Sequence, residues 1–285
     1  MALARLDGRT CLVTGATSGI GLETARGLAA LGAQVVMVGR DRARGEQARK
    51  QVVEKSGNDR VDLLLADLSS LAGIRGLAQE FLAGYPALHV LVNNAGTVEL
   101  SRTTTSDGFE KTFAVNHLAY FLLTNLLLPR LRASAPARIV NVASEAHRFG
   151  RLDLADLQSE KSYRAMRVYG TSKLLNILFT VALAERLAGS GVTANALHPG
   201  AVSTRLGKNN GAFARILIGL LRPFFLTPEQ GAANSIFVAA SDQLEGVSGK
   251  YFVKQRAVAP SRRSQRLQLA RRVWIRSSEL VGLVE

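Results

Sequence analysis

The segment TCLVTGATSGIG, residues 10–21, decides the fold of this 285-residue chain. Its first five residues are short-chained, mostly apolar and partly β-branched, which predicts a buried strand. The glycines that follow predict a tight turn that opens a helix over residues 19–31. Such a turn brings backbone N–H groups and a helix N-terminus against a pyrophosphate. The predicted phosphate-binding residues are Gly15, Thr17, Ser18, Gly19, Ile20 and Gly21.

The spacing of these glycines is G-x-x-x-G-x-G, and no lysine of the Walker type follows them. Hydrolysis of a nucleoside triphosphate is therefore disfavoured, and a bound nucleotide cofactor is favoured. A tight structural turn without a ligand is the alternative explanation, and the clean strand–turn–helix context weighs against it.

Strand-like and helix-like segments alternate along the rest of the chain. Further strands are predicted over residues 34–38, 61–66, 89–93, 138–143, 192–197 and 250–253. Helices are predicted over 41–55, 71–83, 108–131 (with a break near its middle), 165–188 and 229–240. This alternation predicts βαβ units, so we expect one α/β domain with a doubly wound parallel sheet. Ligands of such sheets bind beyond the carboxyl ends of the strands.

Composition limits the class of protein. Apolar residues make up 47% of the chain, so a sizeable core can form and global disorder is excluded. Cys11 is the only cysteine, which favours a reducing, cytoplasmic setting. No signal peptide is apparent, and the uncharged run 112–129 is better explained by a buried helix than by a membrane span. The four histidines have no ligand spacing, so we expect no metal site.

The excess of positive charge is concentrated near the C-terminus. The net charge is +14, and seven arginines with no acidic residue lie between Arg256 and Arg276. The segment could bind an anionic lipid, nucleic acid or acidic partner, or form the solvated face of a helix. We favour the helix, and the lack of interleaved aromatic residues weakens the case for nucleic acid. Residues 1–255 are predicted to be the catalytic domain and 256–285 a basic helical extension.

The end of the second strand indicates which cofactor binds. An acidic residue there favours NAD, whereas an arginine accommodates the 2′-phosphate of NADP. Arg40 lies at this position, and Asp41 follows it at the start of the next helix. Asp41 could cap that helix or contact the NAD ribose. We favour NADP(H), held in part by Arg40.

Tyr169 and Lys173 are four residues apart, on one face of a predicted helix. A free phenol has a pKa near ~10, which is too high for a base at neutral pH. A nearby ammonium stabilises the phenolate and lowers that pKa, so the tyrosine can exchange a proton with a carbinol oxygen. An ordinary Tyr/Lys pair is the alternative.

Together these motifs resemble the classical short-chain dehydrogenases/reductases, from about residue 9 to 253. The matching positions are Thr14–Gly21, Asn93-Asn94-Ala95-Gly96, Asn116, Ser144, Tyr169 with Lys173, and His198-Pro199-Gly200. The segments VNVASEAH (140–147), GRDR (39–42) and GSGVT (189–193) resemble the retinol dehydrogenase-like branch. The resemblance implies a Rossmann-type, three-layer α/β/α fold.

The resemblance also implies a role for each matching residue. Tyr169 would be the general acid/base, and Lys173 would lower its pKa and bond the nicotinamide ribose. Ser144 would hold the substrate oxygen, and Asn116 would anchor a water path to Lys173. The other expected cofactor contacts are Asn93, Ala95 and Gly96 at the adenosine ribose, Asp67 and Leu68 at the adenine, and Pro199, Gly200 and Thr204 at the nicotinamide. Ala143 departs from the commoner double serine.

We therefore expect an NADP(H)-dependent oxidoreductase that interconverts a lipophilic alcohol and its aldehyde or ketone. The apolar segment 211–226 is either a substrate lid or a helix packed on the core, and with Arg215 and Arg222 it could touch a membrane surface. No nucleic-acid partner is expected, and a homodimer or homotetramer is compatible with the sequence. The alternative is a non-catalytic NADP-binding sensor or scaffold that acts through the basic C-terminal segment.

Overall fold

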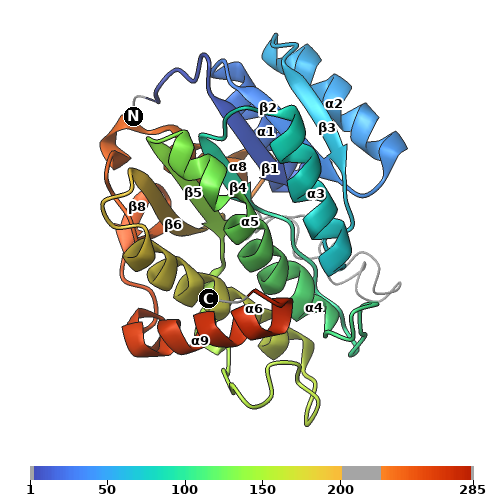
Figure 1. Cartoon of the computed structure of the whole chain (residues 1–285), viewed down its shortest axis with the longest axis vertical. Coiled ribbons are helices and arrows are strands. Elements are labelled where there is room, and N and C mark those ends of the chain that lie inside the picture. Colours follow the sequence, from blue (N-terminus) through green and yellow to red (C-terminus); the bar gives the residue numbers. More distant parts are fainter. Residues whose placement is uncertain (1–2, 201–225, 284–285) are drawn as a thin grey trace.

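A single sheet organises the structure, a computed structural model that describes residues 3–200 and 226–283. Its strands are β1 (Thr10–Thr14), β2 (Gln34–Gly39), β3 (Val61–Leu65), β4 (Val90–Asn93), β5 (Ala137–Val142), β6 (Val192–His198), β7 (Tyr251–Val253) and β8 (Arg256–Val258). They lie in the order β3-β2-β1-β4-β5-β6-β7-β8 (Figure 1). The first seven strands pair in parallel, and β8 pairs antiparallel with β7. The predicted doubly wound parallel sheet is confirmed.

The strand order reverses between β1 and β4, which are neighbours in the sheet. From β1 the chain moves outward to β2 and β3, then returns to β4 and continues to the opposite edge. The loops after β1 and β4 therefore leave the sheet in opposite directions. A crevice at such a switch point is where ligands of doubly wound sheets bind.

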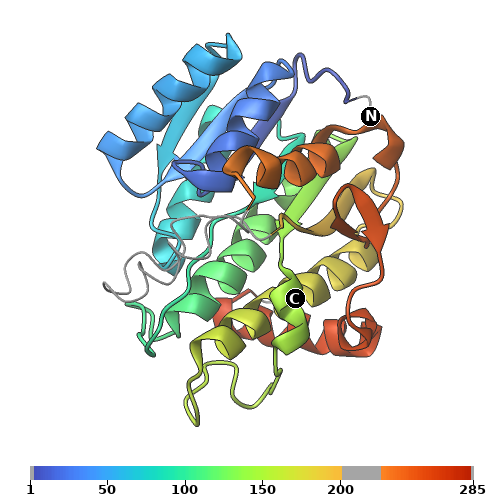
Figure 2. The same cartoon turned by 180° about the vertical axis from the view of Figure 1, so that it is seen from behind.

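Helices cover both faces of the sheet (Figures 1 and 2). The long ones are α1 (Gly19–Ala30), α2 (Arg42–Ser56), α3 (Leu71–Gly84), α5 (Ala119–Ala133), α6 (Ala165–Arg186), α8 (Pro228–Ala240) and α9 (Leu267–Val281). Helices α1, α2 and α8 lie on one face, and α3, α5 and α6 lie on the other. Because the sheet is covered on both sides, the near-continuous apolar run of β2 is buried throughout Val35–Val38.

The helix predicted over residues 108–131 is broken where the sequence predicts. A short helix, α4 (Lys111–Phe113), leads into a π-helical turn (Ala114–Leu118) that continues directly into α5. Within the described residues, the run Lys111–Ala133 alone is long and apolar enough to cross a membrane. However, 72% of its most apolar window is buried inside the structure, as a core helix would be. The interpretation as a buried helix is confirmed.

The basic C-terminal segment forms a helix with one buried face. Ala270, Val273, Trp274 and Val281 of α9 join the core cluster that includes α5 and α6. All seven arginines of the segment are exposed, but only three of them lie on α9, and the others lie in β8 or between β8 and α9. The preference for a solvated helix over a binding surface stays a prediction. The predicted division after residue 255 falls between β7 and β8, two strands that pair with each other.

Candidate active site

A cleft of about 700 Å³ lies at the carboxyl ends of the strands. It extends from the glycine turn after β1, past the ends of β2 and β3, to Tyr169 and the end of β6. The loops after six parallel strands contribute to its walls, so the sheet topology itself assembles it. Within the described residues, no group of three or more His, Cys, Asp or Glu side chains could hold a metal ion.

The glycine turn is fastened to the loop after β4 through one side chain. The Oγ1 atom of Thr14 accepts hydrogen bonds from the backbone N–H of Asn94 (2.9 Å) and Ala95 (3.1 Å), and the Asn94 amide donates back to the Thr14 carbonyl at 2.9 Å. Gly15 has a φ of +65°, and a Cβ there would lie 2.8 Å from the Ala95 Cα. A side chain at residue 15 is thus excluded by backbone conformation and by space. The two loops therefore pack closely together, and the cleft lies directly at the carboxyl ends of the strands.

The N-terminus of α1 has the properties of a phosphate site. Ser18 precedes the helix but makes no side-chain capping bond, and the first turn contains no acidic residue. The first N–H groups of a helix lack partners inside the helix and carry the positive end of its dipole. At the edge of the cleft, they fit the pyrophosphate of a dinucleotide. All six predicted phosphate-binding residues line the cleft.

The two charged residues after β2, Arg40 and Asp41, differ in their hydrogen bonding. Asp41 caps α2, because its Oδ1 accepts a hydrogen bond of 2.9 Å from the Arg44 N–H. Arg40 lines the same cleft with an exposed side chain and has no hydrogen bond or ion pair in the described part of the chain. The carboxylate is thus partly committed to the helix, whereas the guanidinium can bind an anion.

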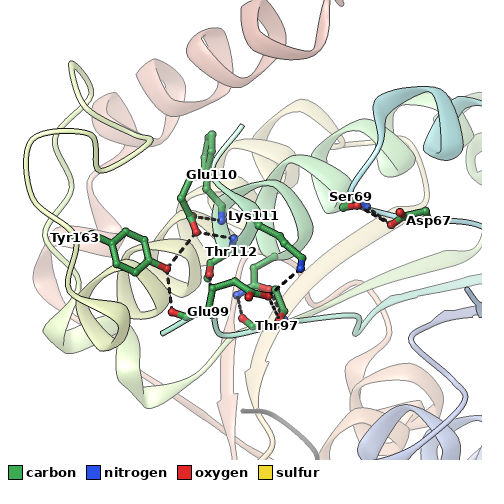
Figure 3. Close-up of polar contacts among 10 residues, drawn as sticks. Asp67, Ser69, Thr97, Glu99, Glu110, Lys111, Thr112 and Tyr163 are labelled. Atoms are coloured by element: carbon green, nitrogen blue, oxygen red, sulfur yellow. Dashed lines mark hydrogen bonds and ion pairs between the residues drawn. The ribbon is translucent and has the colours of Figure 1, made fainter. Parts of the chain in front are cut away.

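Asp67 and Leu68 line the cleft beyond β3, as predicted. Burial raises the pKa of Asp67, but the hydrogen bonds from Ser69 and the charges of Arg40 and Lys111 outweigh it, so the pKa is below its usual value. The backbone N–H and hydroxyl of Ser69 lie 2.9 and 2.7 Å from Oδ1 (Figure 3). The Asp67 carboxylate is therefore held in a fixed orientation at the end of the cleft, where it can accept a hydrogen bond.

Helix α6 brings Tyr169 and Lys173 to the inner end of the cleft, one turn apart. Lys173 is 4% exposed, and its Nζ donates a hydrogen bond of 2.9 Å to the carbonyl of Val142, the last residue of β5. The same nitrogen lies 5.7 Å from the centroid of the Tyr169 ring. The predicted pair is therefore brought together by the helix and by the sheet edge.

The protonation equilibria of this pair are dominated by burial. Burial lowers the pKa of Lys173 to about 7. Burial raises the pKa of Tyr169, and a side-chain hydrogen bond with Ser144 opposes that rise. The effect of the Lys173 ammonium on the pKa of Tyr169 stays a prediction, and the short distance between the two side chains is compatible with it.

Asn116 lies in the π-helical turn, and its amide is fully engaged. Its Oδ1 accepts from the Thr97 N–H at 2.7 Å, while its Nδ2 donates to the Thr97 carbonyl (3.0 Å) and to the Ser172 Oγ (3.0 Å). Isolated π-helical turns are frequent at functional sites. Here the turn joins the loop after β4 to α6 beside Lys173. Asn116 therefore lies behind the wall of the cleft and does not line it.

Ser144 lies just after β5 and begins a short 3₁₀ turn, Glu145–Phe149. Its hydroxyl accepts a hydrogen bond of 3.2 Å from the Ala146 N–H, and the residue lines the cleft near Tyr169.

The wall on the other side of the cleft is held by polar contacts around residues 97–112 (Figure 3). Lys111 and Glu99 form an ion pair of 3.4 Å there, and the Tyr163 hydroxyl donates to the Glu99 carbonyl at 2.9 Å.

Most predicted site residues meet in this cleft. Its lining includes Gly15, Thr17, Ser18, Gly19, Ile20, Gly21, Arg40, Asp67, Leu68, Ala95, Gly96, Ser144, Tyr169, Lys173, Pro199 and Gly200. Asn93 is outside it, because its buried amide donates to Thr124 and Asn141 in the core. Thr204 and residues 211–225 of the predicted lid lie outside the described residues.

Sequence reasoning missed several residues of the site. Thr14 and Asn94 connect the two loops, and Val98, Met166 and His198 add to the walls of the cleft. Thr14, Asn94 and His198 belong to the motifs that match the family but were assigned no role, and their place in those motifs is the signal that could have found them. Met166 lies one turn before the Tyr/Lys pair, but nothing in its local sequence marks it as a wall residue.

Comparison with known proteins gives one consistent result. The model of the short chain dehydrogenase family matches residues 9–214. Retinol dehydrogenase 12 of Mus musculus is 44% identical over 279 residues, which cover 98% of this chain and 88% of that protein. A crystal structure of a protein from Mycobacterium paratuberculosis is 34% identical, with a TM-score of 0.80 over 98% of this chain and 96% of that one. The Pseudomonas aeruginosa RhlG/NADP active-site complex is 30% identical, with a TM-score of 0.70 over 88% of this chain and 97% of that one.

Proposed function

This chain belongs to the short-chain dehydrogenase family, in its retinol dehydrogenase-like branch, and from that membership we propose that it is an NADP(H)-dependent oxidoreductase. It would interconvert a lipophilic alcohol and its aldehyde or ketone. The observation that carries the proposal is the position of Tyr169, Lys173 and Ser144 at the inner end of a cleft that begins at a glycine turn. The lining of the cleft includes the N-terminus of α1 as well as this tyrosine, lysine and serine, so it offers a place for a phosphate group and a place for a reacting carbon.

The cofactor would be held along this path. Backbone N–H groups at the start of α1 would bind the pyrophosphate, and Asp67 would accept a hydrogen bond from the adenine. Lys173 would donate to the nicotinamide ribose with the N–H groups that Val142 leaves free. When bound, the cofactor supplies or accepts the hydride.

The side chains of this protein then move and hold the proton. In the reductive direction, the Tyr169 hydroxyl would donate its proton to the substrate oxygen. The Ser144 hydroxyl donates a hydrogen bond to the same oxygen and keeps the carbonyl in line. The Lys173 ammonium stabilises the phenolate that remains. In the oxidative direction the same groups act in reverse.

The choice of NADP over NAD is supported by the contrast between Arg40 and Asp41. Arg40 is free to bind a 2′-phosphate, whereas Asp41 caps a helix. The lipophilic substrate is supported by the apolar side chains of Val98, Val142 and Met166 in the cleft. The name of the mouse relative, retinol dehydrogenase 12, adds retinol and retinal to the compounds worth testing. We further propose that the protein is cytoplasmic and takes a small lipophilic substrate.

The test is turnover of a panel of lipophilic aldehydes, including retinal, with NADPH and with NADH. We expect reduction with NADPH, and we expect Tyr169→Phe to lower kcat by about 10²–10⁴-fold because the proton donor is lost. Tyr85→Phe is the matched control, since Tyr85 stacks on Phe81 on α3, away from the cleft, and should retain full activity. Undiminished activity of Tyr169→Phe would remove the assigned acid/base, and absence of turnover with tight NADPH binding would favour a sensor.

A further inference from the structure

Among the described residues, no acidic side chain pairs with the buried Lys173 ammonium. Its hydrogen bond within this part of the chain goes to the neutral carbonyl of Val142, and its side chain is almost fully withdrawn from solvent. No charged side chain of the described residues contributes to its pKa, which burial alone lowers to about 7. Since burying an unpaired ammonium is costly, some other group must offset part of that cost for the lysine to remain charged.

Two aromatic rings flank this ammonium. The centroid of the Tyr120 ring lies 5.6 Å from Nζ, and that of Tyr169 lies 5.7 Å from it. Both distances are within the ~6 Å at which a cation is attracted to the negative face of an aromatic ring. Tyr169 is the expected acid/base, but Tyr120 comes from a different element, the first turn of α5, four residues after Asn116. Among the described residues, these two phenols are the titratable groups that face Lys173, and the nearby Asn116 is uncharged.

The hydroxyl of Tyr120 does not explain why a tyrosine is buried at this position. The residue is 1% exposed, and its Oη has no hydrogen-bond partner among the described residues. A buried polar group without a partner costs about 1–3 kcal/mol, so this hydroxyl does not stabilise the fold by direct protein contact. The ring of Tyr120 packs in the hydrophobic core and also faces the ammonium.

We propose that Tyr120 is a positioning residue whose ring holds the Lys173 ammonium in place and in its charged form beside Tyr169. The role of Tyr120 in catalysis rests on the proposed function, whereas its effect on the Lys173 ammonium follows from the geometry. The ring attracts the charged ammonium but not the neutral amine. Removing the ring therefore destabilises the charged form, and the pKa of Lys173 falls further. A neutral lysine no longer stabilises the Tyr169 phenolate.

Three variants separate the ring from the hydroxyl and from simple packing. Tyr120→Phe removes the hydroxyl and keeps the ring, whereas Tyr120→Met removes the ring and fills its space with a flexible side chain. Phe121→Leu is the matched control, because it deletes a fully buried ring from the next position of α5, where the ring packs on Phe179 and Trp274. Tyr120→Leu serves as a second ring deletion if the methionine variant does not fold.

The readout is the pKa of Lys173, obtained from the NMR titration of ¹³Cε-labelled lysine and assigned by the signal that Lys173→Met lacks. We expect Tyr120→Met to lower this pKa by about one unit, and Tyr120→Phe and Phe121→Leu to leave it unchanged. In alcohol oxidation, the high-pH limb of the kcat profile should move down by the same amount in Tyr120→Met alone.

An unchanged Lys173 pKa in the ring deletions, or an equal shift in Tyr120→Phe, would overturn the inference. A loss of kcat without any shift in the pH profile would assign Tyr120 a packing role only and also overturn it. The NMR titration needs no turnover. A shifted lysine signal in a protein that reduces no aldehyde would therefore contradict the proposed function and leave the role of the ring intact.

Discussion

At the scale of single residues, the cofactor end of the cleft depends on two neighbours of opposite charge. Asp41 and Arg40 follow the same strand, yet in the part of the chain that the structure describes only the carboxylate has a hydrogen-bond partner. Because an N-cap already uses one carboxylate oxygen, Asp41 is less available to bind ribose hydroxyls. From the sequence alone, Asp41 could either cap the helix or contact the NAD ribose. The structure is needed to show that its carboxylate accepts a hydrogen bond from the Arg44 N–H.

We predict that Arg40→Asp changes the preferred cofactor from NADPH to NADH. Loss of a charge-assisted hydrogen bond, with a new like-charge repulsion, should raise the KM for NADPH by about 10–100-fold and favour NADH. Steady-state kinetics with both cofactors measure the exchange. Arg42→Asp makes the same charge change two residues further on, outside the cleft, and should leave the preference unaltered. A preference that survives Arg40→Asp would refute the phosphate-binding role.

At the scale of elements, the π-helical turn before α5 connects three helices. Asn116 bonds the loop after β4 and Ser172 of α6, as described above. The next residue, His117, is fully buried with its Nε2 2.8 Å from the Ser277 Oγ of α9 and its Nδ1 3.3 Å from the Asn176 Oδ1 of α6. The turn that presents Asn116 is thus held from the opposite side by the C-terminal helix.

This arrangement predicts a pH-dependent stability. Burial lowers the pKa of His117 to about 4, whereas an unfolded histidine titrates near ~6.5. Between these values the unfolded chain binds a proton that the folded chain does not, so stability falls as the pH falls. In His117→Asn this loss is absent. Urea denaturation at pH 7 and at pH 4.5 should show the advantage of the wild type shrinking by up to about 3 kcal/mol. A difference that is constant with pH would contradict the buried, neutral histidine.

The sequence predicted what depends on local pattern and missed what depends on distant contacts. The strands, the glycine turn and the Tyr169/Lys173 spacing were predictable because period and turn chemistry are local. The edge strand β8 has only three exposed residues and no apolar pattern to reveal it. The inward orientation of Asn93 and the bond between His117 and Ser277 require partners far along the chain.

At the scale of the whole molecule, the C-terminal helix belongs to the hydrophobic core of the catalytic fold. Trp274 packs edge-on against Phe121 of α5 (centroids 4.9 Å apart) and lies beneath the guanidinium of Arg186 of α6 (4.3 Å). Arg271 adds an ion pair to Glu185 of α6. Three of the seven arginines, Arg271, Arg272 and Arg276, therefore lie on a helix whose other face packs on α5 and α6.

We accordingly expect Trp274→Ala to destabilise the protein by about 3–5 kcal/mol, as loss of a large buried aromatic side chain does. Chemical denaturation measures the change, and weakened NADPH binding should accompany it. Arg272→Ala alters an exposed position of the same helix and should change stability by no more than about 0.5 kcal/mol. Equal stability of Trp274→Ala and the wild type would show that α9 is dispensable for the fold.

The bond between His117 and Ser277 also bears on the order in which the molecule is made. It joins residues that are 160 positions apart. A ribosome therefore adds the glycine turn, the tyrosine and the lysine before it adds Ser277, and a growing polypeptide carries those residues before this hydrogen bond can form. A chain cut short before Ser277 lacks the hydrogen bond altogether.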